Sequence, residues 1–178
     1  YLSLLIMVLM GSLMSCYDTL EYSGNLSSMK NQQMSIAQQS NAGLTLPHDE
    51  IAQLRSAVAP YHNMETAVAE GYDTEVTGYR TQMGFHYLKG SLVDQQFELA
   101  RPEALLYAPS PNGGLRLVAV EYVVPIPDIN NPPAPPSGFT GDADVWVINT
   151  EFNMWTLHVW IGLQNPHGIF ASHNPRIP

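Results

Sequence analysis

The sequence predicts an α+β domain, in which an antiparallel sheet of four to five strands is covered on one face by a kinked N-terminal helix. Three observations support this fold class. Residues 49–71 carry apolar side chains at helical spacing, several later segments have the composition and alternation of strands, and no helical segment separates those strands. Parallel strands need long crossover connections, usually helices, so the sheet is expected to be antiparallel.

The helical segment begins after Pro47, because Pro-His-Asp is typical of a helix start. Pro60 lacks a backbone N–H and is expected to divide the segment into helices at about 49–59 and 60–71, the second ending at Gly71. The apolar residues close to one helical face are Ile51, Leu54, Val58, Tyr61, Val68 and Tyr72.

The strand pattern begins at Met83. The expected strands are Met83–Leu88, Ala104–Ala108, Leu115–Val124 and Trp155–Leu163, with Val145–Ile148 as a fifth. Pro-Ser-Pro-Asn-Gly-Gly predicts a hairpin between the second and third of these, and six prolines within 125–138 predict an extended, irregular connection. The expected core residues are Leu54, Val58, Leu117, Val123, Leu157 and Val159.

His158 alternates with Leu157 and Val159 along the last strand, so its side chain belongs to the opposite face. If all three are buried, both faces of that strand must be covered.

Residues 1–16 form an apolar run that ends in small residues and Cys16, the only cysteine. The run is shorter than the roughly 20 residues that span a bilayer, and it resembles a secretory signal peptide. Leu13-Met14-Ser15-Cys16 also looks like a bacterial lipobox. Residues 1–15 are therefore predicted to be a lipoprotein-type signal peptide, with Cys16 as the lipidated first residue of the mature chain. The alternative is a short membrane anchor or buried helix with an incidental thiol.

Residues 16–47 are rich in Ser, Asn and Gln and have few large apolar side chains. Such a segment cannot bury enough surface to offset its ordering entropy, so it is predicted to be a flexible tether to a single domain at 48–178. The chain opens without an initiator Met or a basic region, and a missing start is expected. The expected location is the bacterial cell envelope, on the periplasmic or cell-surface side, with membrane contact through lipid on Cys16.

The net charge of −9 comes from 16 acidic and 7 basic residues, without a basic patch. Nucleic acid binding requires such a patch to neutralise phosphates, so this class of partner is not expected. If Cys16 is lipidated, no thiol remains for a disulfide or a cysteine metal site. No serine stands in a G-x-S-x-G context, which argues against a covalent hydrolase.

His86, Glu121 and His158 each fall within a predicted strand, and they can converge if those strands are neighbours. Two imidazoles and a carboxylate suit zinc or non-haem iron and leave positions for water or substrate. His62 could be a fourth ligand if its helix covers these side chains. In the alternative, the histidines form a hydrogen-bonded polar layer, and Glu121 pairs with Arg101 or Arg116. The spacing fits no short metal-binding motif, so convergence in space decides between the two.

Four segments resemble an uncharacterised family of secreted or lipid-anchored bacterial proteins: MGFHYL (83–88), ARPEALLYAP (100–109), LRLVAVEYVVP (115–125) and WTLHVWIGLQNPHGIFASHNP (155–175). The family's usual forms are MGYHY, RPE-(apolar)-LLY-P, LVAVEY and LH-(apolar)-W…NP-G-F…NP. His173 stands where members often carry an aromatic residue. The resemblance implies an exported protein but carries no settled activity.

Two functions are therefore open. The composition favours a non-catalytic envelope lipoprotein that binds a small ligand or a partner through its aromatic residues and a polar cleft. These aromatic residues are Trp146, Trp155, Trp160 and Tyr122. In the alternative, the protein is an enzyme in which His86, Glu121 and His158 hold a divalent metal that activates water or oxygen.

Overall fold

The computed structural model describes residues 47–178. The predicted signal peptide, Cys16 and the tether up to residue 46 lie outside the described residues. Within the described part of the chain, no helix is both long and apolar enough to cross a membrane.

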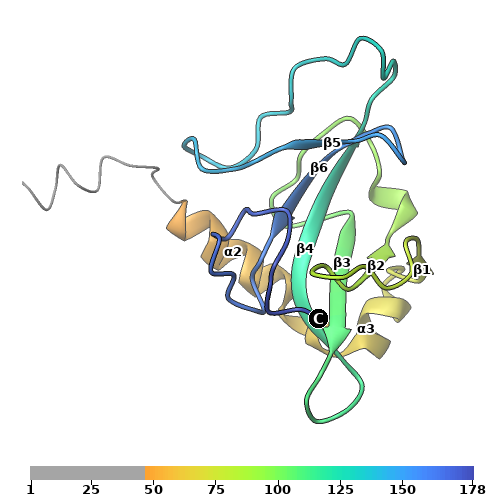
Figure 1. Ribbon diagram of the computed structural model, residues 1–178, viewed down its shortest axis with the longest axis vertical. Helices are drawn as coiled ribbons and strands as arrows, with labels where there is room; N and C mark the ends of the chain where they lie inside the picture. Colours follow the sequence, from red (N-terminus) through yellow and green to blue (C-terminus); the bar gives the residue numbers. More distant parts are fainter. Residues whose placement is uncertain (1–46) are drawn as a thin grey trace, which may run out of the picture. The chain divides into compact units, whose positions relative to one another are not determined.

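A six-stranded antiparallel sheet forms the centre of the domain, with the strand order β1-β2-β3-β4-β6-β5 (Figure 1). The predicted fold class is confirmed, but the sheet has more than the four to five strands expected. The strands are β1 (Thr74–Glu75), β2 (Phe85–Leu88), β3 (Ala104–Pro109), β4 (Leu115–Pro125), β5 (Val147–Asn149) and β6 (Met154–Val159). The strand missed from the sequence is β1, whose two residues are too few to show a period.

Strand β2 begins at Phe85 rather than Met83 because the chain turns sharply at Gly84. Gly84 has a φ of +99°, and a Cβ atom there would lie 2.3 Å from the carbonyl oxygen of Tyr107. Only glycine allows this backbone to approach β3 so closely.

Strand β6 ends four residues before the predicted Leu163. After Val159 the Trp160 N–H bonds to Ile169, and the N–H groups of Gly162 and Leu163 both bond to the carbonyl of Val118. The chain therefore leaves the ladder and crosses over β4. At Gly162 a Cβ would lie 2.3 Å from the Leu117 carbonyl, so glycine is required at this crossing.

The first helix ends just before Pro60, as predicted, but the second begins at Met64 rather than residue 60 and ends at Ala69 rather than Gly71. Helix α2 (His48–Val58) leads into the 3₁₀ turn η1 (Ala59–His62) and then α3 (Met64–Ala69); a second 3₁₀ turn, η2 (Gly90–Leu92), follows β2. The Asn63 side chain accepts hydrogen bonds from the backbone N–H groups of Glu65 and Thr66 and so caps α3. Val68 was expected on the apolar face but is 42% exposed.

Helix α2 covers one face of the sheet, and the chain end around Ile177 covers the other (Figure 1), while Phe170 of the same C-terminal segment packs in the helix-side core. All six predicted core residues are buried, among them Leu157 and Val159 with His158 between them. Both faces of β6 are thus covered, as required. The helix-side core includes Leu54, Val58, Leu105, Tyr122 and Leu157, and the opposite core includes Leu106, Val118, Ala119, Trp160 and Ile177.

A β-bulge in β4 decides which face each of its side chains occupies. Leu106 pairs with Ala119 but Tyr107 pairs with Leu117, so Val118 is the extra residue. Val118 and Ala119 consequently both face the C-terminal segment, while Leu117 before them and Val120 after them face the helix. Past the bulge, Tyr122 points toward the helix side and Glu121 toward the opposite face.

Glu103 is a buried carboxyl group beside the helix-side core, 2% exposed. Its Oε2 accepts a hydrogen bond of 3.0 Å from the Val123 N–H, beyond the last residue of β4 that pairs with β3. Burial nevertheless raises the pKa of Glu103 to about 7, because the charged form loses its hydration.

This pKa predicts a specific pH dependence of stability. The folded protein holds the Glu103 proton more tightly than the unfolded chain, so the stabilisation is complete below pH 4.5 and is lost as the pH rises through about 7. At about 1.4 kcal/mol per pKa unit, the effect is on the order of 3 kcal/mol. The free energy of unfolding of Glu103→Gln minus that of wild type should therefore be largest near pH 8. This difference should be smaller by about 3 kcal/mol at pH 4.5.

Urea unfolding of both proteins across this pH range measures the difference. Glu65→Gln removes an exposed carboxylate on α3 and is the control. A difference between Glu103→Gln and wild type that is constant with pH would show that Glu103 does not titrate in this range.

Candidate metal centre

Three titratable side chains meet on the sheet face opposite α2, and they come from β2, β4 and β6. Glu121 and His158 are direct cross-strand partners. His86 lies on the far side of β3 and pairs with Leu106, while Ala104, two residues earlier on β3, is the residue opposite Glu121. Because alanine is small, it leaves room for the His86 ring and the Glu121 carboxylate to approach each other across β3. The predicted convergence of His86, Glu121 and His158 is confirmed.

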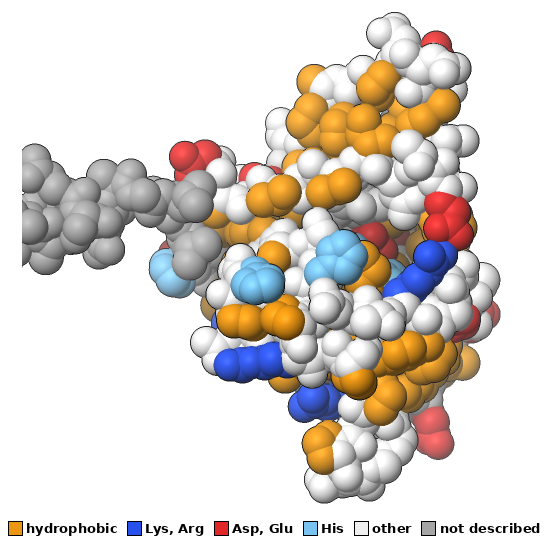
Figure 2. Space-filling model, in the orientation of Figure 1, with side chains coloured by type: hydrophobic (Ala, Val, Ile, Leu, Met, Phe, Trp, Pro, Cys, Tyr) orange, Lys and Arg blue, Asp and Glu red, His pale blue; other side chains and the backbone are white. Residues whose placement is uncertain are grey.

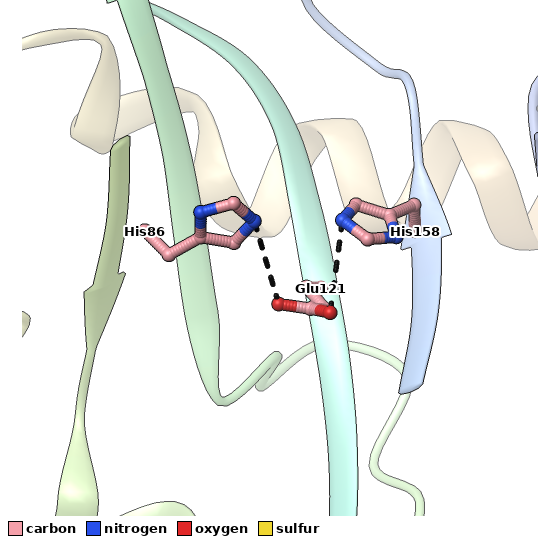
Figure 3. Close-up of side chains that lie close together, drawn as sticks. All are labelled: His86, Glu121 and His158. Carbon is pink, nitrogen blue, oxygen red and sulfur yellow. Dashed lines mark ion pairs between the residues drawn. The ribbon is translucent and has the colours of Figure 1, made fainter. Parts of the chain in front are cut away.

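The three groups are close enough to share an ion (Figure 3). The Nε2 atom of His158 lies 3.6 Å from one Glu121 oxygen, and Nε2 of His86 lies 3.8 Å from the other. These distances exceed the roughly 3.2 Å limit of a good hydrogen bond. Two ligands placed about 2.0–2.1 Å from a tetrahedral zinc ion are about 3.3 Å apart. The three ligand atoms lie within 4.8 Å of one another, so the group could bind a metal ion after an inward shift of the side chains.

Burial controls the protonation of this group, since all three side chains are at most 7% exposed. Desolvation lowers the pKa of His86, against the opposing effect of Glu121, and lowers the pKa of His158 to about 4. Desolvation also raises the pKa of Glu121. Both imidazoles are thus neutral near pH 7, which is the form that binds metals.

Thr77 contacts the ring nitrogen of His86 that is remote from Glu121. Its Oγ1 lies 2.9 Å from Nδ1 of His86 and 2.8 Å from the carbonyl oxygen of Gly78. When the hydroxyl donates its one hydrogen to Gly78, its oxygen accepts a hydrogen bond from the His86 Nδ1–H, and we assign the proton to Nδ1 on this basis. The lone pair of Nε2 is left pointing toward Glu121 and His158, as in metal-bound histidines whose other nitrogen donates to a neighbouring group.

His158 has a buried ring nitrogen whose hydrogen bonding is not satisfied within the described residues. Across the described residues 47–178, its buried Nε2 atom finds no hydrogen-bond partner. Its ring also stacks on Trp160, with centroids 6.1 Å apart and planes 10° apart, which holds its orientation. An unpartnered buried nitrogen costs free energy unless another group occupies the space that it faces.

The triad lies in an open pocket of about 510 Å³. The walls come from β2, β4, the β5–β6 hairpin, the loop before β2 and the C-terminal residues Ser172 and His173. At the pocket, Arg80 donates two hydrogen bonds of 2.8 Å to the carboxylate of Glu151. Figure 2 shows this face, where apolar side chains surround a smaller number of charged groups. The volume is within the usual range of small-molecule sites.

The prediction that His62 is a fourth ligand is wrong. His62 is exposed at the end of η1, outside the His86–Glu121–His158 group. The neighbouring Tyr61 carbonyl accepts a hydrogen bond from Tyr107, which belongs to the helix-side core, so this turn packs on the opposite face.

The proposed partners of Glu121 in a polar layer are also wrong. Arg101 pairs with the exposed Glu98, and within the described residues the ion-pair partners of Glu121 are the two histidines. The aromatic side chains suggested for ligand binding do not form one platform either. Tyr122 and Trp160 are both buried, on opposite faces of the sheet.

Sequence reasoning missed Thr77, Arg80 and Glu151. Each lies in a loop or turn, and their contacts join segments up to 71 positions apart, as for Arg80 and Glu151. Such contacts leave no periodic signal in the sequence.

Comparisons with family models, curated proteins and solved structures give no match for this chain. The resemblance to the bacterial family therefore stays a prediction.

The tautomer assignment is directly testable by NMR. Long-range ¹H–¹⁵N correlation at neutral pH should show the proton of His86 on Nδ1 in the wild type. Thr77→Val keeps the shape of the side chain but removes the acceptor, so the Nε2–H form should become populated. Thr74→Val on β1 is the control. An Nε2–H tautomer of His86 in the wild type would contradict the assignment.

Proposed function

We propose that this domain binds a divalent metal ion through His86, Glu121 and His158, and that the ion binds and activates a ligand in the pocket. One observation carries the proposal. The buried, unpartnered Nε2 of His158 and the Nε2 of His86 both face the same carboxylate at the floor of an open pocket.

A purely structural polar layer accounts less well for this arrangement. In such a layer the histidines would donate to Glu121 at about 2.7–3.0 Å. The observed separations are 3.6 and 3.8 Å, and the tautomer assigned to His86 has its proton on Nδ1, the nitrogen that faces Thr77 rather than Glu121. The Nε2 lone pair of His86 and the Glu121 carboxyl group face the same point as Nε2 of His158, and a cation at that point would bind all three.

The donor set favours zinc, with iron(II) as the second candidate. Two histidines and one glutamate form a familiar catalytic zinc site, in which an open position holds water and lowers its pKa. The same set, arranged on one side of the ion, binds iron(II) and leaves positions for oxygen. We place zinc first, with activation of bound water as its chemistry. The alternative is a non-catalytic site where the ion only holds the ligand.

The metal content of the purified protein tests the proposal. Protein purified without a histidine tag should contain one zinc or iron per chain by elemental analysis. The His86→Ala, His158→Ala double variant should contain none, and Glu121→Gln should bind at least ten times more weakly, since it replaces a charged ligand with a neutral isostere. His62→Gln, which alters an exposed histidine outside the group, should retain wild-type affinity.

Circular dichroism establishes that each variant is folded, so loss of metal can be separated from loss of structure. Less than stoichiometric metal after reloading of the wild type would disprove the site. Equal metal in the double variant would do the same.

We also propose that the domain works at the bacterial cell envelope, attached through lipid on Cys16. The support is the apolar run that ends at Leu13-Met14-Ser15-Cys16 and the polar segment that follows it. Mass spectrometry of the mature protein should find an N-terminal, acylated Cys16, and Cys16→Ser should abolish the acylation. An intact Tyr1 end or a free Cys16 thiol would contradict this location.

A further inference from the structure

We propose that the ligand of this site is an amphiphilic carboxylate, whose single anionic head group binds the metal and whose apolar chain or ring fills the pocket. This inference rests on the proposed metal site and adds the chemical class of the ligand. It follows from the composition of the pocket walls, the pairing of their charges and the charge of the loaded centre.

The walls around the triad are largely apolar. They bring together side chains from the loop before β2, from β2 itself, from β4 and from the β5–β6 hairpin: Val76, Met83, Leu88, Val123, Ile148 and Phe152. A surface of this kind binds by removing apolar ligand area from water. Each added methylene of a ligand that lies along it should tighten binding about fourfold.

The charged groups of the wall neutralise each other. Apart from the triad and His173, the charged side chains that the described residues contribute to this pocket are Arg80 and Glu151. Arg80 bonds both oxygens of Glu151 at 2.8 Å. The pair carries no net charge, so the metal centre supplies the net charge that a charged part of the ligand meets in this pocket.

The charge of the loaded centre selects a monoanion. Imidazoles must be neutral to bind a metal, so two histidines, one carboxylate and a divalent ion carry a net charge of +1. A carboxylate neutralises this charge, whereas a doubly charged phosphate would leave an excess negative charge among apolar walls, which is costly. A neutral alcohol would leave the centre positively charged.

The pocket volume of about 510 Å³ suits such a molecule. Residues of the β5–β6 hairpin and the Arg80–Glu151 pair line this pocket together with the triad, so the apolar part of the ligand can extend from the metal along the hairpin. Acetate or another small acid would leave most of the apolar wall in contact with water.

Calorimetry on the zinc-loaded protein tests the inference. Zinc alone is titrated first, to establish one site per chain. Butanoate, octanoate and dodecanoate then test the apolar wall, and octanol, octylammonium and octyl phosphate test the head group. Octanoate should bind at least tenfold more tightly than butanoate, octanol and octyl phosphate, and octylammonium should not bind. Metal-free protein should lose most of the affinity for octanoate.

A matched pair of variants tests whether the apolar part of the ligand lies against Phe152. Phe152 in the pocket wall and Val68 on α3 are both partly exposed apolar residues, at 38% and 42%. Phe152→Gln should weaken octanoate binding several-fold while leaving zinc affinity unchanged, and Val68→Gln should alter neither.

The outcomes separate the two proposals. If zinc binds stoichiometrically but octanoate binds no better than butanoate, the ligand class is wrong and the metal site stands. Tighter binding of octyl phosphate, or equal binding of octanoate to metal-free protein, would also overturn the ligand class. If zinc does not bind, the metal site and the ligand inference both fail.

Discussion

Strand β4 is buried on both faces along most of its length, and the rest of the domain is arranged to cover it. Its backbone groups are paired with β3 on one side and β6 on the other. Its side chains need two separate apolar covers, because alternate residues point in opposite directions. Helix α2 provides one cover and the C-terminal segment much of the other. The pocket is located where the second cover leaves part of the sheet open.

The candidate metal centre lies at this margin between the covered and the open parts of the sheet. Its residues are buried enough to lose most of their hydration, yet they line a cavity that reaches solvent. Burying a carboxylate and two imidazoles without full hydrogen bonding is unfavourable, and the fold must offset this cost elsewhere. The two apolar cores on either side of β4 and β6 are the obvious source of that stability.

Much of this architecture is readable from the sequence, for identifiable reasons. The helix break at Pro60, the β3–β4 hairpin and the buried residues of β4 and β6 follow from local rules of backbone geometry and alternation. The convergence of His86, Glu121 and His158 needed one further condition, that their strands share a face of one sheet. The error at His62 arose because periodicity indicates that a helix packs on a sheet but does not specify on which side.

The remaining differences come from contacts between distant segments. The early end of β6 depends on the Val118 carbonyl, which accepts hydrogen bonds from Gly162 and Leu163. The hydrogen bond of Thr77 to His86 depends on the path of the loop before β2. The secondary-structure propensities of the neighbouring residues predict neither the end of β6 nor the path of this loop. Both features therefore require the three-dimensional structure.

The bulge at Val118 means that the centre is specified by the parity of a residue count as well as by residue identity. Between Leu117 and Glu121 the strand contains one residue more than regular pairing would place there, and the bulge that accommodates this residue keeps Glu121 on the pocket face instead of the helix side. A chain with the same residues but regular alternation after Leu117 would keep both histidines and the glutamate, yet its carboxylate would face the helix side. A chain that lost Val118 together with the bulge would keep Glu121 on the pocket face, so the site depends on the residue count and the bulge being matched.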